Sequence, residues 1–533
     1  MGARIAVIAF DACDPDLARR LAVEGRMPNL RRLLAQGAHS PVDNPFGLFV
    51  GALWVSFASC QRPARHGYHC WDEIDVASYE WRLRAPDPSR YRSFWSQIGA
   101  AGLRVAAVDV PHSLPRDDLN GVEVAEWGCH DRHFGLRSTP QGLAHEWKQT
   151  YGLHPVLGAE LPGEPHLSSD DFVFRKGRYR TPAEEKSFFE HMVAGARTKS
   201  RILRDLLAQE EWDLFVAVFG ESHALGHQQW HLHDSDHPRF TADARRAVGC
   251  DPVETLYEEL DRAFGQIMAE AGPDTTILLH LSHGMAGHYD GTHLLDEVLK
   301  RLDSPQQGAR RQSSALARLA KPHFPFLQAA AARLGIPRAL SRKVAQRLRG
   351  DSGANRAARR FFQEPNNSVY AGIRINLAGR EPQGRVLPSE VDALYDELER
   401  ELLALKDDRT GGPAVRAVTR SDSVHERRPG DAMPDLFVEW NRSGAPIERV
   451  SSSTIGRVHV PYTHWRTGDH RPAGLLVGVG PGIEVAGEQR AIAVEDIGVT
   501  VAARLGAEVG DADGEVIPWL GIAREQRAAT ERV

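Results

Sequence analysis

The sequence predicts an α/β protein with a mostly parallel central sheet and helices on both faces. Short apolar runs of strand length alternate with amphipathic helical segments along most of the chain, a pattern typical of parallel sheets covered on both sides. Several of these apolar runs end directly at an acidic or histidine side chain. No internal repeat or low-complexity block interrupts the alternation.

The βα units follow one another in order. The apolar run 5–10 predicts a buried strand that ends at Asp11, and residues 14–36 predict a helical region. A helix over 91–101 leads to a strand over 103–108, and a further strand-like run covers 122–125. A helix over 183–209 precedes a strand over 212–218, and a helix over 252–271 precedes a strand over 275–281.

Changes in pattern divide the chain into four parts. Residues 1–300 form the first part of the α/β core, with a lid-like excursion around 135–185 that is rich in Pro, Gly and charged residues. Residues 301–365 are rich in Arg and Ala and predict an inserted helical segment. Residues 366–430 predict a small α+β subdomain, and 431–533 return to the core, carrying His470.

Composition excludes several classes of partner. The chain has 533 residues, 42% of them hydrophobic, and a net charge of −6, so it has no basic footprint for a nucleic-acid polymer. No stretch reaches the roughly 18 apolar residues of a membrane span. Five cysteines without CxxC pairing favour a reducing compartment. We therefore expect a cytoplasmic protein, and the oligomeric state stays open.

The stretch 219–227 is the strongest candidate for a metal site. Glu221, His223 and His227 follow the strand over 212–218 and lie at the start of a helix-like segment. An i,i+4 pair of histidines on one helix face, about 5–6 Å apart at Cβ, suits chelation of one metal ion. The alternative is a pair of core or solvated histidines.

Other strand ends carry similar side chains: Asp11, Ser282-His283 and Asp469-His470. The carboxyl ends of parallel strands meet at one edge of the sheet, so these groups can converge there. An acid and several histidines together favour a first-row transition metal, zinc above all, with iron or manganese as alternatives. His66, His69, His130 and His288 are further candidate pocket residues, although such histidines are more often structural.

The sequence resembles the type I phosphodiesterase and nucleotide pyrophosphatase branch of the alkaline phosphatase superfamily. The resemblance rests on residues 8–14, 27–37, 52–59, 63–67, 373–382, 434–436, 468–471 and 495–500 with 513–514. It implies a mostly parallel sheet between helices, an inserted cap and a metal centre at the strand ends. In that family Asp, His and His hold one metal. Asp, Asp and His hold a second beside a Ser or Thr nucleophile.

Carried over by position, Asp11, His227, His283 and His470 match family ligands. The departures are His223 and Ser282, which stand where the family has Asp, and Val50, which stands at the nucleophile position. Residues 41–55 contain no Ser, Thr, Cys or Tyr, and a covalent intermediate needs a nucleophilic side chain. Asp43 is the one nucleophilic side chain in this window, and a turn-forming role explains it better.

Because His223 and Ser282 stand where the family has Asp, the site has fewer carboxylates than in the family. Such a site suits one divalent ion better than a pair of ions. We therefore predict one metal on His223, His227 and His470, with Asp11, Glu221 and His283 completing the site or supporting its ligands. Glu221 has three candidate roles: ligand, general base, or acceptor that orients a histidine. His283 is the second candidate for proton transfer.

Three functions fit these features. The first is a metal-dependent hydrolase or transferase of a small phosphate or sulfate ester or diester, with direct attack of metal-bound water. The second keeps the metal and performs non-phosphoryl chemistry, because imidazole-rich sites also suit iron or copper. The third is a catalytically silent family member that binds a phosphorylated ligand or a protein partner. The retained histidines argue against the third.

Overall fold

The computed structural model describes residues 3–158, 179–303, 352–366, 369–428, 431–462 and 466–521. Its centre is a ten-stranded sheet that is mostly parallel, as the sequence predicts. The strands, in spatial order, are β20 (Gly487–Glu488), β2 (Ala38–Asp43), β19 (Gly474–Val479), β9 (Thr275–Leu281), β1 (Arg4–Phe10), β8 (Leu214–Phe219), β5 (Val105–Val108), β6 (Gly121–Ala125) and β7 (Arg137–Thr139), with β21 (Ile492–Ala493) paired to β2.

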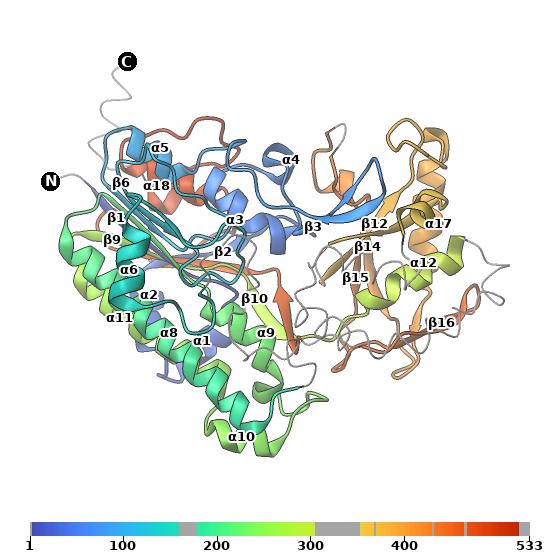
Figure 1. The fold of residues 1–533 in the computed structure, drawn as a ribbon, viewed down its shortest axis with the longest axis horizontal. Coiled ribbons are helices and arrows are strands. Elements are labelled where there is room, and N and C mark those ends of the chain that lie inside the picture. The colour runs from blue at the N-terminus through green and yellow to red at the C-terminus, as the bar shows by residue number, and fades with distance from the viewer. Residues whose placement is uncertain are drawn as a thin grey trace.

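The central strands are buried on both faces because helices cover each side (Figure 1). One face packs against α1 (Pro15–Val23), α2 (Pro28–Gln36), α6 (Leu143–Tyr151), α8 (Pro182–Gln209), α10 (Ala242–Val248) and α11 (Pro252–Ala271). The other face packs against α3 (Phe49–Ser59), α5 (Phe94–Ala100) and α18 (Asp496–Arg504). The predicted continuous helical region 14–36 is two helices, separated by a turn around Gly25.

Side-chain caps start two of the helices that cover the sheet. Asp14 accepts a hydrogen bond from the Leu17 amide at the start of α1, and Asp251 accepts from the Val253 and Glu254 amides at the start of α11. Such caps stabilise a helix by about 1 kcal/mol. The sequence therefore determines these starting points locally.

A second, smaller part lies beside the main sheet (Figure 1). It contains a four-stranded antiparallel sheet and a three-stranded sheet. Its strands are β11 (Phe361–Glu364), β12 (Tyr370–Ile375), β15 (Leu436–Trp440), β14 (Val415–Arg420), β13 (Lys406–Asp407), β16 (Arg449–Ser452) and β17 (Gly456–His459). Its helices are α12 (Leu295–Asp303), α16 (Gly353–Ala357) and α17 (Val391–Leu403).

Short elements connect the two parts. These are α4 (Pro63–His66), the hairpin of β3 (Asp72–Asp75) and β4 (Glu80–Leu83), and the antiparallel ribbon of β10 (Gly284–Gly287) and β18 (Gly468–Arg471). Most of the predicted helical insertion 301–365, and residues 159–178 of the predicted lid, lie outside the described residues. The predicted domain boundaries stay predictions.

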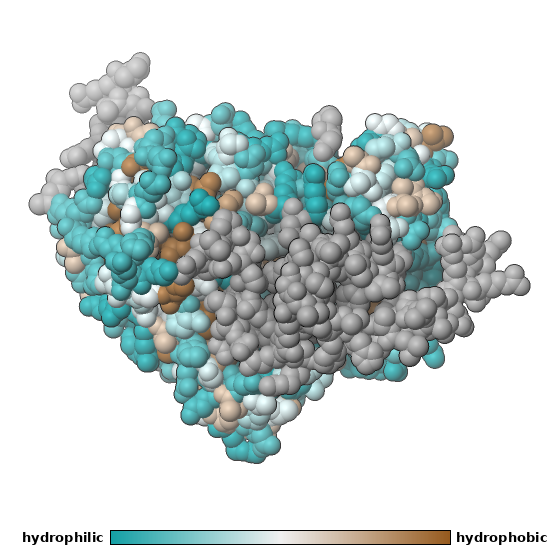
Figure 2. Space-filling view, in the orientation of Figure 1, coloured by the Kyte–Doolittle hydropathy of each residue, from teal (hydrophilic) through white to brown (hydrophobic). Residues whose placement is uncertain are grey.

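The described surface seen in Figure 2 is largely hydrophilic, with small hydrophobic patches between polar side chains. None of the helices in the described ranges combines the length and the apolar content that a membrane crossing requires.

Candidate metal centre

The carboxyl ends of β1, β8 and β9 bring the predicted site residues together. These strands are parallel neighbours, and Phe10 pairs in register with Phe219 and with Leu281. Asp11 and Ser282 directly follow β1 and β9, and α9 (Glu221–His233) begins two residues after β8. The convergence predicted from the parallel strands is therefore observed at this edge.

The β10–β18 ribbon adds the remaining histidines. His283 precedes β10, and His470 lies on β18, opposite Met285. The ribbon packs tightly on α9, because a Cβ at Gly468 would lie 2.3 Å from the Gly226 carbonyl oxygen. Glycine at position 468 thus permits the close approach that brings His470 to the histidines of α9.

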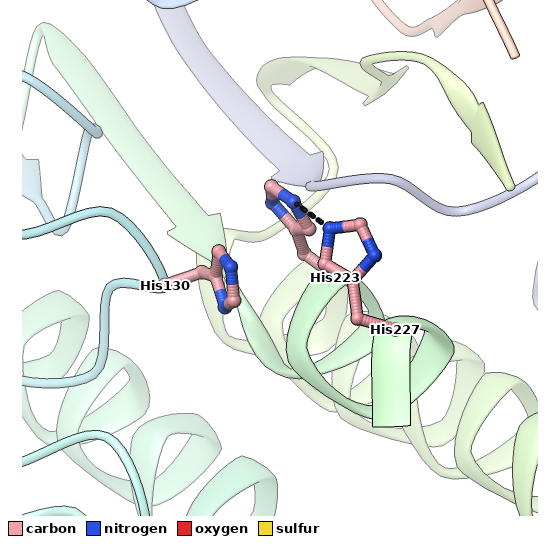
Figure 3. A group of neighbouring side chains, drawn as sticks. All are labelled: His130, His223 and His227. Atoms are coloured by element: carbon pink, nitrogen blue, oxygen red, sulfur yellow. Dashed lines mark hydrogen bonds between the residues drawn. The ribbon is translucent and has the colours of Figure 1, made fainter. Parts of the chain in front are cut away.

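Three imidazole nitrogens face one another at the centre. The Nε2 atom of His223 lies 3.1 Å from Nε2 of His227 and 2.8 Å from Nε2 of His470. Figure 3 shows the His223 and His227 rings, one helical turn apart on α9, directed toward each other. All three side chains are buried, at most 3% exposed.

Hydrogen-bond partners determine the tautomers. His223 Nδ1 lies 2.6 Å from Asp11 Oδ2, and His227 Nδ1 lies 2.8 Å from the Gly468 carbonyl oxygen. Because both partners are acceptors, each Nδ1 carries the proton and each Nε2 presents a lone pair. His470 Nδ1 lies 3.2 Å from Asp469 Oδ1 but makes no hydrogen bond within the described residues. The Nε2 lone pairs of His223 and His227 face each other at 3.1 Å and repel unless a cation lies between them.

The protonation state of this cluster also suits a metal. Burial holds the pKa of His223 and His227 well below the usual histidine value, and neighbouring histidines and Arg466 lower it further. Burial likewise lowers the pKa of His470, although Asp469 acts in the opposite direction. Neutral imidazoles are the form that binds a transition metal.

Asp11 supports the ligands instead of presenting a free carboxylate. Its Oδ2 atom accepts from His223, and its Oδ1 atom accepts from Trp54 Nε1 at 2.9 Å and from Ser282 Oγ at 3.1 Å. The carboxylate therefore fixes the orientation of His223, one of the two roles predicted for Asp11.

His283 and His130 lie at the edge of the three central rings. The His283 ring centroid lies 4.8 Å from that of His470, and His283 Nε2 is buried without a hydrogen-bond partner among the described residues. The His130 ring stacks on His223 at 4.0 Å (Figure 3). The sequence predicted His130 only as a candidate pocket residue, because a single histidine five residues after the predicted strand gives no chelating pattern.

Glu221 does not join the histidines. Its Oε1 atom lies 3.3 Å from His154 Nε2 and 3.7 Å from Lys199 Nζ. Burial alone would raise the pKa of Glu221, but Lys199 and His154 hold it below the usual value. The ionised carboxylate therefore belongs to a separate buried network, and its predicted ligand or base role has no geometric support.

An aromatic ring closes the side where a nucleophile was expected. Helix α3 begins at Phe49, whose side chain is 1% exposed and whose ring lies 5.7 Å from His283 and 6.3 Å from His470. Asp43 is exposed at the end of β2. No hydroxyl group of residues 41–55 is available here, since the segment contains none.

A nearby serine–histidine pair is not a catalytic dyad. Ser56 Oγ lies 3.0 Å from His66 Nε2, but the Tyr68 amide donates to His66 Nδ1. The proton of the neutral ring therefore lies on Nε2, which donates to Ser56 and cannot accept its proton. Ser56 and Ser59 are both buried in α3.

Comparison with known proteins identifies the family of this chain. The family model for type I phosphodiesterase / nucleotide pyrophosphatase matches residues 5–470, so the chain belongs to that family. The family name denotes hydrolases of phosphoric esters and pyrophosphates. A search of curated proteins gave no significant match.

Similar solved structures include murine ectonucleotide pyrophosphatase / phosphodiesterase 5, with 11% identity, a TM-score of 0.47 and coverage of 96% of this chain and 97% of that chain. The human protein of the same name has 10% identity and a TM-score of 0.45, with coverage of 96% and 97%. Phosphonoacetate hydrolase from Sinorhizobium meliloti has 14% identity and a TM-score of 0.42, with coverage of 91% and 92%.

Proposed function

We propose that the protein is a metal-dependent hydrolase or transferase that acts on a small phosphate or sulfate ester or diester without a covalent enzyme intermediate. The observation that carries this proposal is the convergence of three histidine Nε2 atoms in a buried site of a phosphodiesterase-family chain. We assign the metal to His223, His227 and His470, with zinc preferred and iron or manganese as alternatives.

A bound divalent ion would polarise the ester and lower the pKa of a bound water to about 7. The residues of the chain would orient the metal ligands and transfer protons. Asp11 and the Gly468 carbonyl hold His223 and His227 in the tautomer that presents Nε2. His283 completes the ligand set or moves a proton, because its Nε2 atom is buried beside the three rings and has no partner within the described ranges.

The side chains around the site support the proposal of direct attack by water. Phe49 lies against His283 and His470 and offers no nucleophilic atom. Ser282, where the family has an acid, donates to Asp11 and supplies no second carboxylate. Both features support one metal within the histidine cluster and no phosphoryl-enzyme.

Metal content and turnover of bis-p-nitrophenyl phosphate test the proposal. We expect stoichiometric metal and turnover in the wild type, and loss of both, by about 100-fold or more in kcat/KM, in His227→Gln. His145→Gln is the matched control, because His145 is exposed on α6. Tight metal binding without cleavage of any phosphate or sulfate ester would refute the proposal. Non-phosphoryl chemistry would then be the better explanation of the imidazole-rich site.

A further inference from the structure

A second group of potential ligands lies beside the histidine cluster. His288 and Asp290 follow β10, Asp469 lies on β18, and one ligand atom from each lies within 4.8 Å of the other two. All three are buried, at 5%, 5% and 2% exposure. The group is separate from the three facing Nε2 atoms, but it adjoins them because Asp469 precedes His470.

His288 lies between Tyr462 and Asp290. The Tyr462 hydroxyl is 3.1 Å from His288 Nδ1 and 3.2 Å from the Arg466 carbonyl oxygen. His288 Nε2 lies 2.7 Å from Asp290 Oδ2. A ring nitrogen and a carboxylate oxygen at this distance need a cation between them, either a proton or a metal.

The Asp469 carboxylate gives a second indication of a bound cation, independent of the His288–Asp290 contact. Neither of its carboxylate oxygens has a hydrogen-bond partner among the described residues, although the side chain is almost fully buried. Its nearest nitrogens are His470 Nδ1 at 3.2 Å and His288 Nδ1 at 3.9 Å. A buried carboxylate without hydrogen bonds is costly unless a cation is close to it.

The charges permit a divalent ion. Asp290 and Asp469 contribute two negative charges, and Arg466 is the cationic side chain that acts on both His288 and Asp469. Against the effect of burial, Asp290 and Asp469 favour a proton on His288 by raising its pKa; a metal ion would displace that proton, and one negative charge would then remain in excess. A set of one imidazole and two carboxylates suits zinc, manganese or iron.

We propose that His288, Asp290 and Asp469 bind a second divalent cation next to the histidine cluster, with Asp469 positioned between the two sites. This site uses none of the positions that carry metal in the family resemblance described above. The inference does not rest on ester hydrolysis, since it concerns only how many ions the chain binds and where.

Another group of three ligand-type residues serves as a contrast. His233, Asp251 and Glu254 also lie close together but are only half-buried. Glu254 is already paired with Arg20 and Arg26, and Asp251 caps α11. Its negative charges are therefore satisfied by the protein, which makes it a suitable control.

Metal stoichiometry tests the inference on the full-length protein. The chain is stripped with a chelator, reloaded with Zn²⁺ or Mn²⁺ alone, and analysed by mass spectrometry of the bound metal. We expect two ions per wild-type chain, one in His288→Gln, Asp290→Asn or His227→Gln, and none in the His227→Gln/His288→Gln double variant. Glu254→Gln is expected to keep two.

One ion in both the wild type and His288→Gln would overturn the inference, since a proton would then occupy the position beside Asp290. If the variants do not fold, by near-ultraviolet circular dichroism, anomalous scattering from Zn²⁺-loaded wild-type crystals decides. A peak between His288 and Asp290 supports the inference, and a single peak at His223 refutes it. Two bound ions without ester cleavage would refute the proposed function and leave this inference intact.

Discussion

At the scale of single residues, Asp11 connects the sheet to the metal centre. One of its oxygens accepts from His223, and the other accepts from Trp54 and Ser282. The same carboxylate thus sets the tautomer of a metal ligand and satisfies two buried donors. Sequence position predicted that Asp11 lies at the site, but only the contacts show that it acts through His223.

Asp11→Asn is expected to weaken metal binding by about 10–100-fold, because an amide cannot accept from donors on both sides and leaves His223 poorly oriented. The buried donors left without partners should also lower the free energy of unfolding by about 1–3 kcal/mol. Metal titration and urea unfolding measure the two effects. Asp16→Asn is the control, since Asp16 is 72% exposed on α1. Unchanged metal affinity in Asp11→Asn would contradict the orienting role.

At the scale of elements, the small sheet is joined to the hairpin of β3 and β4 through a buried acid. Glu364 on β11 accepts from the Ile74 amide on β3 at 3.3 Å. Burial raises the pKa of Glu364 to about 7, although Arg374 and this amide lower it. The carboxyl group is therefore mostly protonated in the folded protein below neutral pH.

This pKa predicts how stability depends on pH. A carboxyl group that binds its proton more tightly in the folded chain stabilises the fold at low pH. That advantage declines as the pH rises from the ordinary value of 4.5 to about 7. The group's contribution to the free energy of unfolding should fall by about 3 kcal/mol over this interval.

Glu364→Gln should remove this decline, so the variant becomes more stable relative to the wild type above pH 7. Urea unfolding between pH 5 and pH 8 measures the difference. Glu397→Gln, at a partly exposed position of α17, should keep the wild-type pH dependence. Parallel curves for Glu364→Gln and the wild type would show that Glu364 is ionised in the folded protein.

At the scale of the whole molecule, Lys199 on α8 holds three core segments together beneath the metal centre. Its buried ammonium group donates to the carbonyl oxygens of Val218 and Gly128 at 3.0 and 3.1 Å. It also lies 2.9 Å from Asp109 Oδ2 and 3.7 Å from Glu221 Oε1. The start of α9 and the loop that carries His130 are therefore fixed to one cation.

Lys199→Met is expected to lower the free energy of unfolding by about 3–5 kcal/mol, because two buried carboxylates lose their counter-charge. Metal affinity should also fall, since the loop and α9 carry the surrounding histidines. Lys186→Met on the same helix is the control: Lys186 is 52% exposed, and the expected change is within about 0.5 kcal/mol. Equal stability of the two variants would contradict the role of Lys199.

Much of the architecture could be predicted from the sequence because its signals are local. Apolar runs predicted β1, β8 and β9, and helical periodicity predicted α8 and α11. The break near Gly25 between α1 and α2 was not predicted, since the apolar pattern continues through it. The helical insertion and part of the lid lie outside the described residues, so those predictions remain open.

The candidate site was predicted in part. An i,i+4 pair on α9 and polar residues after parallel strands are local patterns, so His223, His227, His283 and Asp11 were identified. Glu221 follows the same pattern, yet its side chain turns toward Lys199. A residue's place at a strand end is a sequence property, whereas the direction of its side chain depends on which buried charge it meets.

The sequence by itself determined the fold class, the family and the position of several histidines at one edge of the sheet, because periodicity and strand ends are encoded over short stretches. Only the tertiary structure decided that three Nε2 atoms face one another, that Asp11 orients His223, that Phe49 closes one side, and that Asp290 and Asp469 meet at His288. These facts depend on contacts between segments up to some 420 residues apart, such as Phe49 and His470. Distances and tautomers at such separations are set by packing.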